Sequence, residues 1–393
     1  MRLDSHLHIS FKSLLKQLSY RQSRQLLRAL QLSALLGALL FFLLALQLTS
    51  GSFQLAGTDL ARSLVEVTTN PFTSLFLGLL ATAVVQSSST TTSLIVAIVA
   101  AGDLSLSQAI PMVMGANIGT ALTSTIVSLG HIGNREEFQY AVAGAALHDF
   151  FNIFTVFLLF IVEFFTGSLS QLSLFLANEV GLMEGNGLGS LLFFIHDLAQ
   201  WLLGFLQNVP LLAPMLGLLA LFLSLSLLTQ VMRWLIIGRV QRNLNATLFG
   251  RPWRSLLSGF GLTAAFQSSS VTTSLLVPLV ATRKVDLRQA FPFVMGANMG
   301  TTTTALIAAL ITTGTGRTAA LSAAFVHVLF NLGGTLFFYP LARIRNFPVW
   351  LADQVGRLSF RSRLYGVTYV ILIFFFLPFL LIFITEGLGW LKE

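Results

Sequence analysis

The chain has 393 residues, of which 55% are hydrophobic and only 10% are charged, and its mean hydropathy is +0.81. This composition excludes a set of soluble domains and is typical of an α-helical protein that crosses a membrane several times. The formal charge of +8 does not indicate nucleic-acid binding, because the basic residues gather in short loops between apolar runs. The chain has no cysteine, which excludes disulfides, iron–sulfur clusters and thiolate zinc sites.

The first long apolar run, residues 29–48, follows a basic N-terminal segment. About 20 helical residues cross a hydrocarbon core of about 30 Å, and this run is long enough to do so. Residues 1–28 contain no small-residue cleavage pattern after their lysines and arginines. We therefore expect residues 1–28 to form an uncleaved cytoplasmic tail and residues 29–50 to form the first membrane-spanning helix.

An internal repeat dominates the rest of the chain. The 43 residues from Gly78 align without a gap with the 43 residues from Gly259, and 25 of the aligned pairs are identical. Each copy contains a glutamine followed by serines and threonines, QSSSTTTS at 86–93 and QSSSVTTS at 267–274. Identity at this level indicates an internal duplication.

The two repeat cores are expected to span residues 70–165 and 248–341. In the first core the hydroxyl block divides the apolar sequence into residues 71–85 and 94–101, both too short to cross a membrane as helices. Two half-length segments around a polar tip predict a re-entrant hairpin, which is stable at membrane depth where it is buried in protein or lines a watery cavity. We expect one such hairpin in each repeat.

The stretch after the first hairpin, residues 106–129, is long enough to cross fully but contains GANIGT at 115–120. Two glycines and an asparagine in mid-helix predict a broken helix, and GANMGT at 296–301 predicts the same in the second copy. Residues 140–165 are then expected to cross back. The predicted fold class is an all-α polytopic membrane protein with two inverted repeats, each with a re-entrant QSSS hairpin and a broken helix.

The inversion of the repeats is predicted from loop charges. The hairpin of the first copy returns at Gly102 and Asp103, whereas that of the second copy returns at Arg283 and Lys284. Because short basic loops favour the cytoplasmic side, we expect corresponding loops to lie on opposite sides of the membrane.

The segments outside the repeats are apolar helices and loops. Next to the first core the sequence carries acids and no bases, so we expect residues 166–237 to form an extracellular loop and linking helices. Within it, residues 191–206 are expected to lie at the membrane surface and residues 211–228 to be long enough to span. Residues 342–393 are expected to form a basic loop, a final membrane-spanning helix at 364–384 and a tail.

This organisation predicts a secondary transporter. Inverted repeats with interrupted, hydroxyl-rich elements place two half-sites against each other near the middle of the membrane. Hydroxyls, the glutamine amide and the ends of half-helices can replace water around a small ion. Because neither motif contains a lysine or arginine, an anion held there would rely on dipoles, hydroxyls and accompanying cations, which favours coupling to sodium.

Ionisable and amide side chains also lie inside the apolar runs. Asp149 is a functional candidate, because an acid within a membrane helix is costly, and its counterpart in the second copy is a valine. His148 and Asn152 lie four residues apart on one helix face, as do His327 and Asn331. These pairs are either contacts between helices or ligands.

At these motifs the chain resembles the type II sodium-coupled phosphate cotransporters, including their bacterial members. The resemblance covers both repeats and the final helix, and paired QSSS blocks followed by GxN-GT are specific to that family. It implies symport of inorganic phosphate with Na+ as the co-transported ion, in a lipid bilayer, without enzymatic activity or an organic cofactor. The long glycosylated loop of animal members is missing, which is consistent with a multi-pass protein of a bacterial inner membrane.

The resemblance implies that the two QSSS hairpins carry the phosphate site. The phosphate ligands that it implies are Gln86, Ser87, Ser88, Gln267, Ser268 and Ser269. We extend the predicted substrate set to Ser89, Ser270, Asn117 and Asn298.

The resemblance also implies sodium sites. Thr125 and Asn152 match positions linked to sodium, and Asp149 matches an aspartate that electrogenic members tie to an additional sodium ion, so we expect an electrogenic cycle. We extend the predicted sodium set to Ser89, Ser270, Thr301 and Asn331. The chain departs from the animal members in the loop before the helix expected at residues 140–165, where His131 and Asn134 replace a glutamine and an aspartate.

Two other classes of protein are weighed against a symporter. An intramembrane serine hydrolase would combine a QSSS serine with His148 and Asp149, but adjacent residues on a helix project in different directions and no G-x-S-x-G motif is present. A passive channel, or a sodium-coupled transporter of another small anion, would have the same hydroxyl lining. The sequence contains no nucleotide-binding motif and no feature that sets an oligomeric state.

Overall fold

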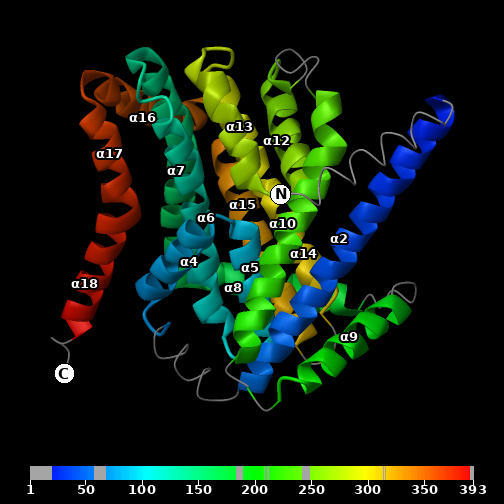
Figure 1. Ribbon diagram of the computed structural model, residues 1–393. Coiled ribbons are helices and arrows are strands. Elements are labelled where there is room, and N and C mark those ends of the chain that lie inside the picture. Colours follow the sequence, from blue (N-terminus) through cyan, green and yellow to red (C-terminus); the bar gives the residue numbers. More distant parts are fainter. Residues whose placement is uncertain are drawn as a thin grey trace.

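The computed structural model describes residues 20–56, 68–182, 189–207, 209, 212–240, 248–312, 314 and 316–389. In these residues the chain is a bundle of helices and contains no strand (Figure 1). The helices are α2 (Tyr20–Ala56), α4 (Pro71–Val85), α5 (Ser88–Ala101), α6 (Leu106–Leu129), α7 (Arg135–Thr166), α8 (Ser168–Leu182), α9 (Gly189–Gly204), α10 (Leu212–Val240), α12 (Pro252–Phe266), α13 (Ser269–Ala281), α14 (Leu287–Leu310), α15 (Arg317–Phe338), α16 (Ala342–Arg361), α17 (Arg363–Ile371), the π-helix η1 (Leu372–Phe376) and α18 (Leu377–Gly389).

Six helical stretches in the described part of the chain are long and apolar enough to cross a membrane. These are Gln25–Phe53, Leu106–Leu129, Arg135–Thr166, Leu287–Leu310, Arg317–Phe338 and Arg363–Ile384. Large apolar side chains cover the outside of the bundle, among them Phe164 and Phe165 with 71% and 78% of their surface exposed. An all-α, multi-pass membrane protein accounts for both observations.

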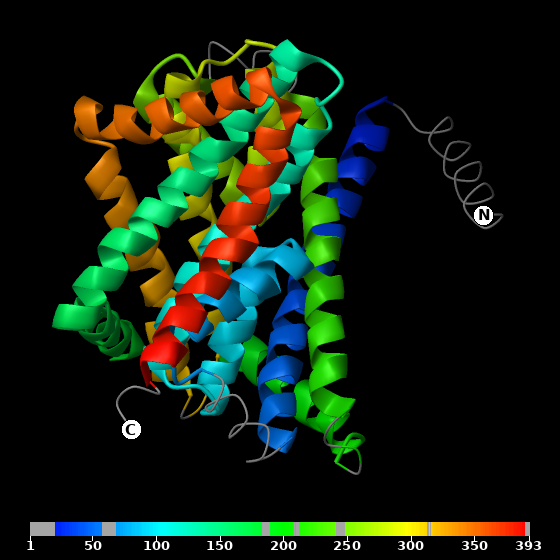
Figure 2. The same ribbon diagram turned by 90° about the vertical axis from the view of Figure 1, so that its left-hand side faces the viewer.

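Two helical hairpins, α4–α5 and α12–α13, lie in opposite halves of the bundle (Figures 1 and 2). Each turns at its QSSS block, where Gln86 and Gln267 have φ of +55° and +53°. In each hairpin the next residue, Ser87 or Ser268, caps the second helix with its hydroxyl. Opposite halves are what inverted repeats require, while the side of the membrane from which each hairpin enters stays a prediction.

The hydroxyl block is more helical than expected. We expected the second half of the first hairpin at residues 94–101, but α5 begins at Ser88. The threonines satisfy their hydroxyls within the helix, because Thr92 Oγ1 donates to the carbonyl of Ser88 at 2.8 Å. In the second copy Thr273 Oγ1 donates to the carbonyl of Ser269 at the same distance. Such bonds to the carbonyl four residues back let hydroxyl residues continue a buried helix.

The predicted breaks at the two GAN motifs are wrong, because α6 and α14 are continuous helices. The glycines instead allow close packing. A Cβ atom on Gly115 would lie 1.8 Å from the carbonyl oxygen of Leu75, and one on Gly296 would lie 1.9 Å from that of Leu256. The helix pairs α4–α6 and α12–α14 therefore have backbones in direct contact, as small residues permit in membranes.

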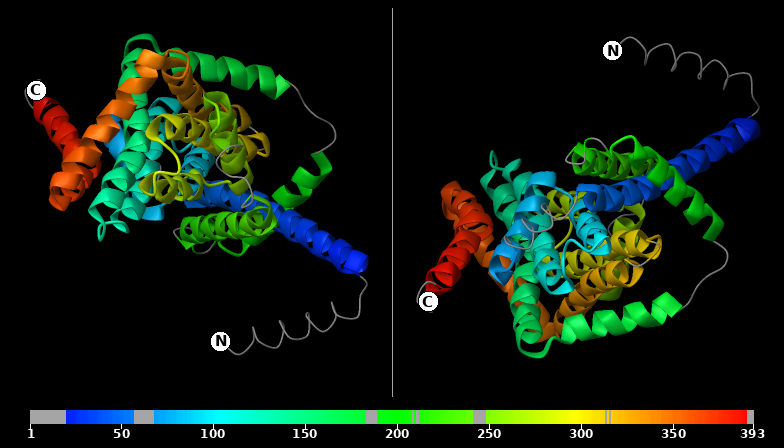
Figure 3. Two further views of the ribbon diagram at one scale, coloured as in Figure 1. Left: turned by 90° about the horizontal axis from the view of Figure 1, so that it is seen from above. Right: turned by 90° about the horizontal axis from the view of Figure 1, so that it is seen from below.

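The remaining helices surround this core. Helix α10 packs along α2, where Thr49 Oγ1 donates to the carbonyl of Gly217 at 3.0 Å. Helices α8 and α16 run across the bundle axis near opposite ends, and the final helix α17–η1–α18 lies on the outside (Figures 2 and 3). The expected surface helix at 191–206 corresponds to α9, at the lower end of α2 in Figure 1. The first helix begins earlier than expected, at Tyr20, and residues 1–19 of the expected tail lie outside the described residues.

Candidate functional site

The tips of the two hairpins meet in the centre of the bundle. Ser89 Oγ donates to the backbone carbonyl of Gln267 at 3.1 Å, so a residue of one QSSS block touches the other block. Ser88 and Ser269 are buried, with 3% and 2% of their surface exposed. The Oγ atom of Ser269 has no hydrogen-bond partner within the described part of the chain. The junction therefore contains a buried hydroxyl that is free to bind a further group.

The two glutamines of the tips differ in their surroundings. The side chain of Gln267 is buried, accepts from Thr304 Oγ1 at 2.5 Å and donates to the carbonyl of Ala264. The side chain of Gln86 is exposed, and none of the described residues forms a recorded hydrogen bond with it. The glutamine of the second tip is therefore held by hydrogen bonds within the protein, whereas the glutamine of the first tip is exposed.

Behind the tips, each GAN asparagine contacts the histidine of the other repeat. His148 Nε2 donates to Asn298 Oδ1 at 2.7 Å, and His327 Nε2 donates to Asn117 Oδ1 at 3.2 Å. The remaining contacts join α6, α7, α14 and α15: Asn298 Nδ2 to Asn152 Oδ1 at 2.7 Å, Asn152 Nδ2 to the carbonyl of Asn117 at 2.7 Å, and Asn331 Nδ2 to Asn117 Oδ1 at 3.1 Å.

These amides hold one another in place. Asn117, Asn298 and Asn152 use both ends of their side chains within the protein, since Asn117 Nδ2 also donates to the carbonyl of Val113. Such mutual satisfaction favours a contact between helices over direct ion binding. Their predicted roles as ligands, like that of Asn331, stay predictions.

Asp149 lies in a second polar cluster, between α6, α7 and α17. It is fully buried, and its Oδ2 atom accepts from Tyr369 Oη at 2.8 Å and lies 3.4 Å from Thr125 Oγ1. The other oxygen, Oδ1, has no partner among the described residues. Thr125 Oγ1 also lies 3.2 Å from the carbonyl of Ala121, and its single proton can serve only one acceptor. The carboxylate of Asp149 and the hydroxyl of Thr125 therefore retain lone pairs that no described donor uses.

The other predicted sodium residues do not join this cluster. Thr301 Oγ1 donates to the carbonyl of Ala297 within α14, Ser89 is at the tip junction, and Ser270 is buried in the first turn of α13. Within the described residues, two groups of the predicted sodium set come together: Thr125 lies beside Asp149, while Asn152 and Asn331 both contact Asn117 in the amide cluster.

Sequence reasoning missed two residues of these clusters, Tyr369 and Thr304. Tyr369 is a hydroxyl-bearing residue inside an apolar run, and that was the available signal. Thr304 follows the GANMGT motif by three residues, on the face of α14 that meets Gln267.

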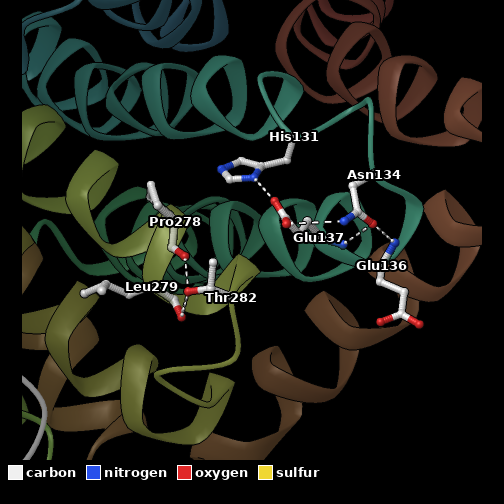
Figure 4. A network of polar contacts seen from close by, with 7 residues as sticks. All are labelled: His131, Asn134, Glu136, Glu137, Pro278, Leu279 and Thr282. Atoms are coloured by element: carbon white, nitrogen blue, oxygen red, sulfur yellow. Dashed lines mark hydrogen bonds and ion pairs between the residues drawn. The ribbon is translucent and has the colours of Figure 1, made fainter.

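His131 and Asn134, which we expect to differ from the residues of animal members, lie in a surface loop between α6 and α7 (Figure 4). His131 Nδ1 donates to Glu137 Oε2 at 2.9 Å, and Asn134 Nδ2 donates to Glu137 Oε1 at 3.3 Å. The side-chain oxygen of Asn134 also accepts from the backbone of Glu136 and Glu137, which caps α7. These bonds explain His131 and Asn134 as residues that order the start of α7.

The serine-hydrolase alternative is contradicted by the contacts of His148 and Asp149. His148 donates to Asn298, and Asp149 accepts from Tyr369. A catalytic triad needs the acid behind the imidazole and a serine before it.

Helical hairpins that meet at a hydroxyl-rich centre, with a buried acid beside them, define a secondary transporter. A family model described as the Na+/Pi-cotransporter matches residues 41–183 and 220–350. The chain belongs to this family of transporters, and the resemblance inferred from its QSSS and GAN motifs is confirmed.

Individual relatives carry related names. The human sodium-dependent phosphate transport protein 2B is 30% identical over an alignment of 455 positions, which covers 92% of this chain and 66% of the relative. The rat sodium-dependent phosphate transport protein 2A is 31% identical over an alignment of 440 positions, which covers 92% of this chain and 69% of the relative. The chain thus spans about two thirds of the length of these relatives. No solved structure matches the chain.

Proposed function

We propose that this protein is a secondary active symporter that takes up inorganic phosphate coupled to sodium in an electrogenic cycle. The relatives named above are sodium-dependent phosphate transport proteins, and their alignments cover 92% of this chain. The observation that carries the proposal is the junction of the two QSSS tips, where Ser89 contacts Gln267 and the buried hydroxyl of Ser269 has no partner among the described residues.

The tips suit a tetrahedral anion. Helices α5 and α13 both begin there, and their first N–H groups and positive dipole ends favour negative charge. The phosphate ligands in this proposal are Gln86, Ser87, Ser88, Ser89, Gln267, Ser268, Ser269 and Ser270, with Asn117 and Asn298 behind them. Since the two blocks contain no basic side chain, the anion is bound by neutral donors and balanced by cations.

Sodium is assigned first to Asp149 and Thr125. A hard cation prefers oxygen ligands, and these side chains place a carboxylate and a hydroxyl 3.4 Å apart. A sodium ion between them compensates the buried charge, which otherwise has no ion-pair partner among the described residues. The further sodium ligands of the proposal are Ser89, Ser270, Asn152, Thr301 and Asn331.

We place the protein in a bacterial inner membrane, with the repeats inverted and residues 166–237 outside. The absence of a long loop between the repeats supports the bacterial assignment, and the basic residues of the α13–α14 loop support the orientation.

Uptake of labelled phosphate into proteoliposomes tests the function. An inward sodium gradient should drive accumulation of phosphate above its external concentration, and replacement of sodium by potassium should abolish it. Equal entry with and without sodium, which stops at equilibrium, would identify a channel instead.

A further inference from the structure

The final helix, α17–η1–α18, packs loosely against the transport core. Only 11% of its most apolar 18-residue stretch is buried, the lowest share among the membrane-spanning helices of the described residues. An apolar groove of about 890 Å³ lies between this helix, α4 and α7, lined on its side by Ile373, Leu377 and Leu381, and Phe379 packs on Phe76 of α4 beside it. Its course along the outside of the bundle is visible in Figure 2. A helix with so few apolar contacts depends on the specific ones that it makes.

Near its start, this helix approaches α7 closely. Gly366 is buried against α7, and a Cβ atom there would lie 3.0 Å from the ring of Phe138. Tyr369 follows one turn later on the same face, and its ring packs on Phe150. The π-helix η1 begins three residues beyond Tyr369, and such segments often mark functional sites. The close approach brings the tyrosine hydroxyl to Asp149.

Tyr369 donates the shorter of the two side-chain hydrogen bonds to Asp149. Its Oη lies 2.8 Å from Oδ2, whereas Thr125 Oγ1 lies at 3.4 Å and is closer to the carbonyl of Ala121. A buried carboxylate without a cation needs donors, since an unmatched charge in a membrane is costly. A sodium ion bound at the carboxylate would balance its charge in place of these donors.

We propose that Tyr369 belongs to the sodium site proposed above: its hydroxyl satisfies the Asp149 carboxylate while the site is empty and is displaced from that oxygen when sodium enters. The proposal rests on the proposed sodium-coupled function. It makes the final helix, which lies outside both repeats, a part of the cation site. The hydroxyl competes with the ion, so its removal should favour the sodium-bound state.

The test is Tyr369→Phe, compared with Tyr365→Phe one turn earlier. Tyr365 is 53% exposed and has no recorded contact with Asp149, so it is a matched control. Sodium activation of phosphate uptake is measured in proteoliposomes at saturating phosphate. We expect the half-activating sodium concentration to fall about tenfold in Tyr369→Phe, because the empty carboxylate loses a charge-assisted bond, and to stay unchanged in Tyr365→Phe.

A second measurement separates this role from a structural one. In an Asp149→Gly background, Tyr369→Phe should cause no further shift, since the shared partner is gone. Sodium-dependent thermal stabilisation in detergent gives the same half-saturation without requiring transport. An unchanged or higher half-activating concentration in Tyr369→Phe, or an equal shift without Asp149, overturns the proposal. Absence of sodium-dependent uptake in the unmutated protein would instead overturn the proposed function.

Discussion

The hydroxyl of Ser269 offers a sharp test of the phosphate site, because none of the described residues forms a hydrogen bond with it. Ser269 is 2% exposed and its Oγ has no partner among the described residues, so Ser269→Ala removes no internal hydrogen bond. A bound phosphate, however, would lose one charge-assisted donor, worth about 1.5–3 kcal/mol. This corresponds to about 10- to 150-fold weaker phosphate affinity.

Phosphate dependence of uptake at saturating sodium measures the loss, and thermal unfolding in detergent should show no loss of stability. The control is Ser359→Ala, which removes a buried hydroxyl that donates to the carbonyl of Val355 in α16 at 2.8 Å. This control should lower stability by about 1 kcal/mol and leave phosphate affinity intact. If Ser269→Ala and its repeat counterpart Ser88→Ala both bind phosphate as tightly as the unmutated protein, the site lies elsewhere.

Three further predictions concern charge, packing and topology. Asp149→Gly should retain part of the sodium-dependent uptake but lose its acceleration by an inside-negative potential, which is worth about 2.3 kcal/mol per charge and 100 mV; equal voltage dependence in both proteins would remove Asp149 from the cation site. Gly115→Ala should destabilise the fold by about 1–3 kcal/mol in thermal unfolding, because its Cβ meets the backbone of α4, whereas Gly133→Ala, with no atom within 4 Å of its Cβ, should be neutral. Cysteines replacing Asp103 and Lys284 should react with an impermeant reagent from opposite sides of the membrane, and reaction from one side would refute inverted repeats.

Much of the architecture follows from the sequence because duplication and apolar length are local signals. The helix α4 covers residues 71–85, the first half-segment expected from the position of the QSSS block. The spans at 106–129 and 140–165 also correspond to α6 and to most of α7. In each case a long apolar run and its polar end are visible without knowing what the helix touches.

The errors arose where the meaning of a residue depends on its neighbour in space. Glycine in an apolar run predicts a break if its surroundings are water, but permits close packing if another backbone lies against it, as Leu75 does at Gly115. The pairing of His148 with Asn298 depends on the register between two repeats, which no local pattern contains. Tyr369 lies 220 residues from Asp149 in sequence, so their contact required the fold.

The two clusters divide the molecule into a symmetric and an asymmetric part. The QSSS tips and the His–Asn contacts occur in both repeats, so we expect both halves to offer similar donors to an anion. The acid occurs once, since a valine, Val328, occupies the matching position, and its donor Tyr369 comes from a helix outside the repeats. A charge placed on one half alone makes the two halves respond differently to the membrane potential. We therefore expect the voltage dependence of transport to depend on Asp149 and the final helix, and recognition of the anion to depend on the duplicated tips.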